Sequence, residues 1–208
     1  MRFESFSRTV SLASLFFLMP FAAAADEGHP FKMPAIGQSF SYQQTETGKP
    51  DLAWTETVKG VGQHNGHEVY FLEGRPGAQY TTARRVADGN YVGWINEKGQ
   101  PTFSGSPYVG QYKWPMKIGE SWNTRYTWKN HGKGKNYAIK ESWEVVAFED
   151  LTTPAGTFPV YKLETESKSR TKTTWFSPAL GVEIKAVQIR KNGDTRTTTL
   201  TKISDGSS

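Results

Sequence analysis

Turn-forming residue pairs interrupt this chain at close intervals and divide it into segments that suit β-strands. Asn65-Gly66, Asp88-Gly89, Lys98-Gly99 and Asn192-Gly193 lie between short runs rich in threonine, tyrosine and valine. Asn-Gly and Asp-Gly are favoured in hairpins because both central residues of a type I′ turn need a positive φ. No segment after Asp26 has a sustained helical period of apolar residues. Short strands separated by such turns predict an antiparallel meander.

The expected strands cover most of the chain. They span residues 40–45, 52–61, 67–72, 78–86, 91–96, 121–128, 137–148, 171–176, 182–190 and 195–203, and one more strand runs through Tyr161, Leu163 and Thr165. About ten strands without helices predict an all-β fold, an antiparallel meander that forms a curved open sheet, a half-barrel or a barrel. The last segment is mostly threonine, arginine and lysine, which predicts an edge strand whose polarity discourages further pairing.

One later segment, residues 121–128, has a clear two-residue period. Trp122, Tyr126 and Trp128 share one face and polar residues occupy the other, which is the pattern of a half-buried strand. In residues 137–148 the same alternation is broken, because the apolar residues continue out of phase at Val146. This break predicts a β-bulge or a strand that is buried on both sides.

The N-terminus has the three parts of a secretory signal peptide. Arg2 and Arg8 give a charged start, an apolar stretch of about a dozen residues follows, and four alanines end at Ala25. Because a membrane span needs about 20 apolar residues, we expect cleavage near Ala25 of a signal peptide, residues 1–25, rather than an anchor. Residues 26–208 then form a single β-rich domain. We expect it in the periplasm or outside the cell, with no membrane span.

The chain contains no cysteine. Its stability is therefore expected to come from packing, although an exported protein could form disulfides. The absence also excludes lipid attachment through a cysteine, thiol catalysis and cysteine metal ligands. The formal net charge is +5 and the basic residues are scattered among acids, apart from the run at residues 129–135. We interpret that run as a solvated turn, so no nucleic-acid partner is indicated.

Three segments combine proline, glycine and aromatic residues where a strand must reverse. They read W-P-M-K-I-G-E-S-W in residues 114–122, T-P-A-G-T-F-P-V-Y in 153–161 and W-F-S-P-A-L-G-V-E-I in 175–184. Over residues 108–203 the chain resembles a family of bacterial periplasmic β-rich proteins of unknown function. Members of that family carry P-x-x-x-G-x-x-W, P-A-G-T-F and W-[FY]-[SA]-P-x-x-G-[VL] motifs. The resemblance implies a half-barrel-like sheet of the kind found in lipoprotein carriers and lipid-binding envelope proteins, and it implies no catalytic residue.

Aromatic residues and one acid are the candidates for a ligand site. Aromatic faces stack on sugar rings and cover lipid chains, but each ring also buries about 150–250 Å², so the same rings could form the core. Glu141 falls between Ile139 and Trp143 on the apolar side of its strand, where it could act as an acid or hold a polar ligand group. The alternatives are a bulge that turns Glu141 outward and an ion pair with an arginine such as Arg84 or Arg125. The candidate ligand-binding residues are Trp122, Tyr126, Trp128, Glu141, Trp143 and Trp175.

Motifs for metal, nucleophile or nucleotide chemistry are weak or missing. His64 and His67 flank the Asn65-Gly66 turn and would face each other across a hairpin, but zinc sites normally use three or four protein ligands. The serines of residues 103–107 lack the G-x-S-x-G pattern of a nucleophile elbow, so we interpret this segment as a loop. The sequence has no phosphate-binding loop and no dinucleotide fingerprint. We expect neither a metal nor a cofactor.

These features favour a non-enzymatic envelope protein that binds a lipid or another apolar small molecule on a concave aromatic face of its sheet. Two alternatives stay open. The first is a glycan-binding or cell-wall-associated module with tryptophans exposed on one flat face. The second is a hydrolase that uses Glu141, which requires a second carboxylate within about 5 to 10 Å in an open cleft.

Overall fold

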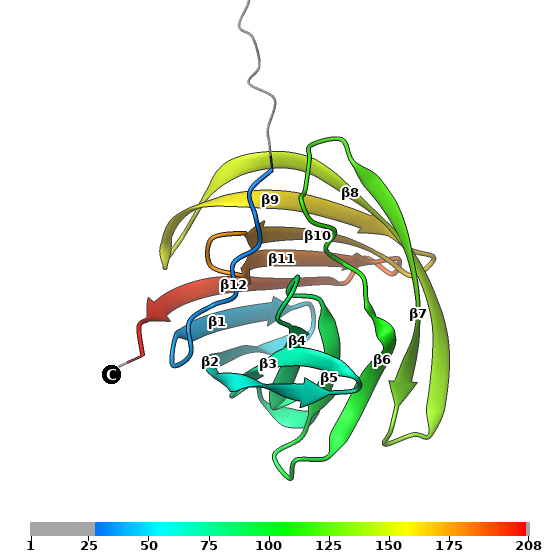
Figure 1. Ribbon diagram of the computed structural model, residues 1–208. Helices are drawn as coiled ribbons and strands as arrows, with labels where there is room; N and C mark the ends of the chain where they lie inside the picture. The colour runs from blue at the N-terminus through cyan, green and yellow to red at the C-terminus, as the bar shows by residue number, and fades with distance from the viewer. Residues whose placement is uncertain (1–27, 207–208) are drawn as a thin grey trace, which may run out of the picture.

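A computed structural model describes residues 28–206, and in this part of the chain twelve β-strands are joined by short connections (Figure 1). The predicted signal peptide lies outside the described residues. A three-residue 3-10 helix, Gly77–Gln79, separates β3 from β4. The strands are β1 (Ser39–Glu46), β2 (Lys49–His64), β3 (His67–Glu73), β4 (Thr81–Arg85), β5 (Tyr91–Ile95), β6 (Pro101–Val109), β7 (Ser121–Asn130), β8 (Lys135–Thr153), β9 (Gly156–Glu166), β10 (Arg170–Ser177), β11 (Val182–Arg190) and β12 (Thr195–Ser204).

The strands form a closed barrel. Each strand pairs antiparallel with the next in chain order, and β12 pairs with β1 to complete the ring (Figure 1). The predicted all-β meander is confirmed, and of the three forms that the sequence allowed, the barrel is the one observed. No helix within residues 28–206 has the length and apolarity needed to cross a bilayer.

Two details of the predicted strand pattern are wrong. β12 is not an edge strand, because it hydrogen-bonds to β11 on one side and to β1 on the other. Residues 103–107 are not a loop but part of β6, which pairs with both β5 and β7. The register between β5 and β6 shifts twice, between Tyr91 and Gly93 and again between Trp94 and Ile95. An irregular strand that contains proline and glycine gives no clear two-residue period.

The predicted bulge and hairpin turn are both present. The register between β8 and β9 shifts between Val145 and Ala147, where the apolar pattern breaks. Asn65 and Gly66 have φ values of 49° and 78° at the tip of the β2–β3 hairpin, and His64 pairs with His67 across it. These positive φ values at both central positions are the ones a type I′ turn requires.

Gly181 is the glycine of the W-F-S-P-A-L-G-V-E-I turn motif in residues 175–184. It connects β10 to β11 with a φ of 68°, and a Cβ at this position would lie 2.2 Å from the Lys32 carbonyl oxygen. The neighbouring Lys32 N–H donates to the Pro178 carbonyl at 3.0 Å. Glycine is therefore required both by the backbone angle and by the close approach of the N-terminal segment.

Along the long strands, the inward face changes from apolar at one end of the barrel to polar at the other. In β1 it runs from Phe40 and Tyr42 to Gln44 and Glu46, in β10 from Phe176 to Lys172 and Arg170, and in β12 from Leu200 to Arg196. Because neighbouring strands pair antiparallel, with one register shift in each of these two pairings, the apolar positions meet in one half of the barrel. The polar positions meet in the other half.

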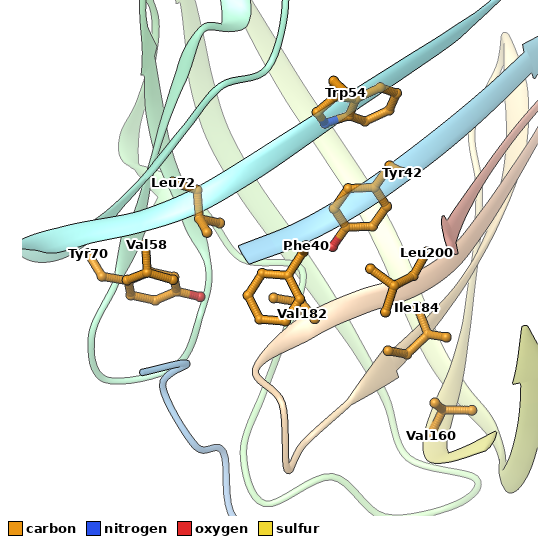
Figure 2. Close-up of a cluster of buried hydrophobic side chains, with 10 residues drawn as sticks. All are labelled: Phe40, Tyr42, Trp54, Val58, Tyr70, Leu72, Val160, Val182, Ile184 and Leu200. Carbon is orange, nitrogen blue, oxygen red and sulfur yellow. The ribbon is translucent and has the colours of Figure 1, made fainter. Parts of the chain in front are cut away.

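The apolar half is filled by side chains. Figure 2 shows Phe40 beside Val182, with Leu200 and Ile184 next to them and Val160 beyond Ile184, and all five are buried. Phe31 and Met33, from the segment before β1, pack against this cluster as well. The N-terminal segment thus extends the core at this end. The internal cavity lies in the polar half of the barrel.

Candidate ligand-binding site

The cavity in the polar half of the barrel has a volume of about 400 Å³. This lies within the range of about 300–1,000 Å³ that is typical of small-molecule sites. Its walls combine aromatic, charged and amide side chains from both early and late strands. They include Arg75, Tyr91, Trp94, Gln111, Tyr126, Trp128, Ile139, Glu141, Trp143, Arg170, Lys172, Glu183, Gln188 and Arg196.

One wall is an aromatic cluster. The rings of Trp94 and Trp128 meet edge to face with their centroids 4.5 Å apart, and Phe103 stacks on Trp128 at 5.6 Å. Tyr126 meets the edge of Trp128 at 6.2 Å. These contacts are within the range in which aromatic pairs stabilise each other. Because the rings pack against one another, they form an apolar wall rather than a flat platform.

Another part of the cavity wall is polar and contains the carboxylate of Glu183, which lies inside the barrel. Its Oε1 accepts hydrogen bonds from the hydroxyls of Tyr112 at 2.8 Å and Tyr91 at 3.3 Å. The Lys172 ammonium lies 3.7 Å away and the Arg84 guanidinium 3.8 Å away. Burial opposes the charge, but Lys172, Arg84 and the Tyr112 hydroxyl outweigh it and lower the pKa of Glu183 to about 2.

Glu141 also faces the cavity, as strand alternation predicts. Its side chain is buried, accepts a hydrogen bond from the Tyr126 hydroxyl at 3.2 Å and forms an ion pair with Arg170 at 3.3 Å. The outward bulge that the sequence left open is therefore not present at this residue. The ion pair with an arginine is present, and the arginine is Arg170.

Four of the six candidate residues line the cavity: Tyr126, Trp128, Glu141 and Trp143. Trp122 does not, because it packs against the buried core and its indole N–H donates to the Gly110 carbonyl at 3.1 Å. Trp175 lies on the other face of β10 from the buried Phe176, and its indole N–H donates to Glu149 at 2.8 Å. The ammonium groups of Lys162 and Lys185 lie over its ring, 5.8 and 5.4 Å from the centroid.

Several residues of the cavity wall were not predicted from the sequence. Lys172 could have been found, because it shares a face of β10 with Phe176 and is thus an inward-facing charge. Trp94 could have been assigned by alternation only if the register of β5 were known. Arg75 follows β3 in a connection, where no periodicity predicts the direction of a side chain.

His67 and His131 each contact a polar group of a neighbouring segment. The Nε2 atom of His67 lies 2.8 Å from the Pro107 carbonyl oxygen, and that of His131 lies 2.9 Å from the Ser104 hydroxyl. Within residues 28–206, no group of three or more histidine, aspartate or glutamate side chains is placed to hold a metal ion.

A cluster of ion pairs lies at the polar end of the barrel around Glu46. Its carboxylate contacts Lys49 at 2.8 Å, Arg190 at 2.9 Å and Arg196 at 2.8 Å. Hydrogen bonds from Arg196 and Lys49 lower the pKa of Glu46 to about 2, against the opposing effect of burial. This cluster ties β1 to the β11–β12 hairpin at the point where the barrel closes.

We expect the protein to lose stability as the pH falls from 4.5 to 2. The pKa of Glu46 is lower in the folded state than its ordinary value of 4.5, so its contribution is complete above pH 4.5 and disappears as pH drops through 2. Glu183 acts in the same direction over the same range. Thermal unfolding of Glu46→Gln should show a weaker dependence on acid than wild type, because one of these two groups is gone. Glu144→Gln, at an exposed position of β8, should retain the wild-type dependence; equal acid profiles for wild type and Glu46→Gln would contradict this role.

The fold and site together define an all-β protein whose single closed barrel is packed at one end and hollow at the other. Among solved structures, the chain is similar to an exported protein with a YmcC-like fold from Bacteroides fragilis, with a TM-score of 0.52 and 13% identity over 86% of this chain and 100% of that one. The chain therefore has a YmcC-like fold.

Two further solved structures have lower TM-scores. A lipoprotein from Parabacteroides distasonis has a TM-score of 0.43 and 15% identity over 84% of this chain and 99% of that one. The hypothetical lipoprotein YmcC from Escherichia coli has a TM-score of 0.46 and 12% identity over 81% of this chain and 85% of that one. No protein-family model matches the chain, and no curated protein matches it.

Proposed function

We propose that this is an exported protein that binds a small molecule with an apolar portion inside its barrel. The observation that carries the proposal is the cavity of about 400 Å³ bounded by the Trp94–Trp128 aromatic cluster. The signal-like N-terminus and the fold shared with an exported protein support the expected location in the envelope. A largely preformed cavity is typical of small-molecule binding sites.

The two other functions are less well supported by the geometry. A glycan module needs ring faces open to solvent, whereas the faces and edges of Trp94, Trp128 and Phe103 are engaged with one another. A glycosidase needs one carboxyl group with a raised pKa to act as the acid. The second carboxylate of this cavity is Glu183, whose pKa is lowered, and Glu141 is paired with Arg170.

A cavity-filling substitution tests the proposal. Ala186 lines the cavity on β11, and the next residue, Val187, has its side chain on the opposite face of the strand. We expect ω-bromodecanoate, whose bromine quenches tryptophan emission on contact, to quench the wild-type protein in a saturable manner. Ala186→Phe should weaken this binding at least tenfold, since the added ring occupies the ligand volume.

Val187→Phe is the matched control, because it adds the same ring outside the barrel. It should bind ω-bromodecanoate as wild type does. Absence of quenching in wild type, or equal quenching in Ala186→Phe and wild type, would contradict binding in the cavity.

A further inference from the structure

The cavity walls carry more positive than negative groups. Arg75, Arg170, Lys172 and Arg196 face it together with only two carboxylates, Glu141 and Glu183. The excess matters because a charge in a partly desolvated cavity is costly unless it is paired and hydrogen-bonded. The four cations differ in whether they already have acceptors within the protein.

Two of them do. Arg170 donates to Glu141 at 3.3 Å and to Gln188 at 3.2 Å. Arg196 donates through its Nε to Glu46 at 2.8 Å, within the ion-pair cluster at the polar end of the barrel. Both guanidinium groups therefore already have acceptors within the protein, and these acceptors include Glu141 and Glu46.

The other two cations keep donors unused. Within residues 28–206, the Arg75 guanidinium makes no hydrogen bond and no ion pair, and it lies over the Trp54 ring at 4.9 Å from the centroid. Lys172 is 3.7 Å from Glu183, beyond the range of a good hydrogen bond, and its ammonium has no other acceptor in the described part of the chain. The oxygen of Glu183 that faces it already accepts from two tyrosine hydroxyls.

We propose that Arg75 and Lys172 form the seat for an acidic group, a carboxylate or a phosphate, at one end of a ligand whose apolar part lies against Trp94 and Trp128. This inference rests on the proposed function and names its ligand class, an anionic amphiphile. A guanidinium presents a planar fork of donors that matches two oxygens of a carboxylate or phosphate, and an ammonium adds a third donor as a point charge.

Neutral ligands fit these walls less well. An alcohol offers one oxygen and no charge, so it leaves Arg75 without a counterion and the ammonium of Lys172 without a close acceptor. Glu56, the other acid near Arg75, does not replace the ligand. Among the described residues Glu56 forms no ion pair with Arg75, and its Oε1 atom has no hydrogen-bond partner.

Calorimetric titration with three ligands of equal chain length tests the inference: decanoate, decyl phosphate and decan-1-ol. Both acids should bind wild type more tightly than the alcohol, by about 10- to 100-fold, which corresponds to a hydrogen bond between charged groups. Whichever acid binds more tightly identifies the head group that the seat prefers. Arg75→Gln should reduce the affinity for the acids by a similar factor and leave that for decan-1-ol within about threefold.

Two further variants keep the test decisive. Arg125→Gln removes an exposed arginine from the outer face of β7 and should bind all three ligands as wild type does. Lys172→Gln should also weaken binding of the acids, so the seat can be examined even if Arg75→Gln folds poorly. If decan-1-ol binds as tightly as the acids and Arg75→Gln and Lys172→Gln have no effect, the acidic seat is wrong while binding in the barrel stands. If none of the three ligands binds wild type, both proposals fail.

Discussion

Glu183→Gln should lower the free energy of unfolding by about 3–5 kcal/mol, the cost of removing one partner from a buried ion pair. The carboxylate is the counterion of Arg84, whose side chain is only 6% exposed, and of Lys172, whose side chain is 19% exposed. A neutral amide has nearly the same size and still accepts a hydrogen bond, so the change isolates the charge. Since small domains are stable by only about 5–15 kcal/mol, urea unfolding should show a large shift of the midpoint.

An exposed acid provides the comparison. Glu164, with a side chain that is 47% exposed, pairs with Lys162 at 3.1 Å on the barrel surface. Glu164→Gln should change the free energy of unfolding by less than about 1 kcal/mol, because exposed ion pairs contribute little. If Glu183→Gln were as mild as Glu164→Gln, the cavity would be more hydrated than this structure implies, and the paired role of Glu183 would be wrong.

Phe40→Ala is the second substitution with a large expected effect. Phe40 is completely buried among Val182, Leu200 and Ile184 in the packed half of the barrel (Figure 2). Truncating a buried phenylalanine removes its transfer free energy and leaves a void, at a cost of about 3–5 kcal/mol. Urea unfolding of the variant should give a lower midpoint with an unchanged slope.

Ile189→Ala is the matched control for the core, because Ile189 is 48% exposed on β11. It should change the free energy of unfolding by less than about 0.5 kcal/mol. An equal loss in both variants would show that the packed end of the barrel contributes no more than the surface does.

The two-residue alternation of the strands gave the most accurate predictions from the sequence. The period of residues 121–128 placed Tyr126 and Trp128 on the inner face, and the same rule placed Glu141 and Trp143 there. The break at Val146 also marked a real bulge. Where a strand keeps its two-residue period, the sequence is enough to separate the inner face from the outer one.

Register shifts are the reason that other cavity residues could not be predicted. Trp175 pairs with Lys185 and Phe176 pairs with Glu183, so Ile184 is an extra residue in β11. As a result Glu183 faces the cavity while the adjacent Ile184 is buried in the core. Simple alternation allows only one of two neighbours to face inward, and a bulge exists only in the pairing of two strands.

The closure of the barrel could not be predicted from the sequence for a similar reason. The polar face of β12 matches an edge strand in composition, but Arg196 and Thr198 line a polar cavity instead of meeting solvent at a sheet edge. Composition does not separate these two environments.

The most direct test of the account is a crystal structure of the protein with ω-bromodecanoate. We expect anomalous scattering from bromine inside the barrel against the Trp94–Trp128 cluster, with the carboxylate within hydrogen-bond distance of Arg75 or Lys172. Bromine found only on the outer surface, with the cavity holding water alone, would contradict a ligand site inside the barrel.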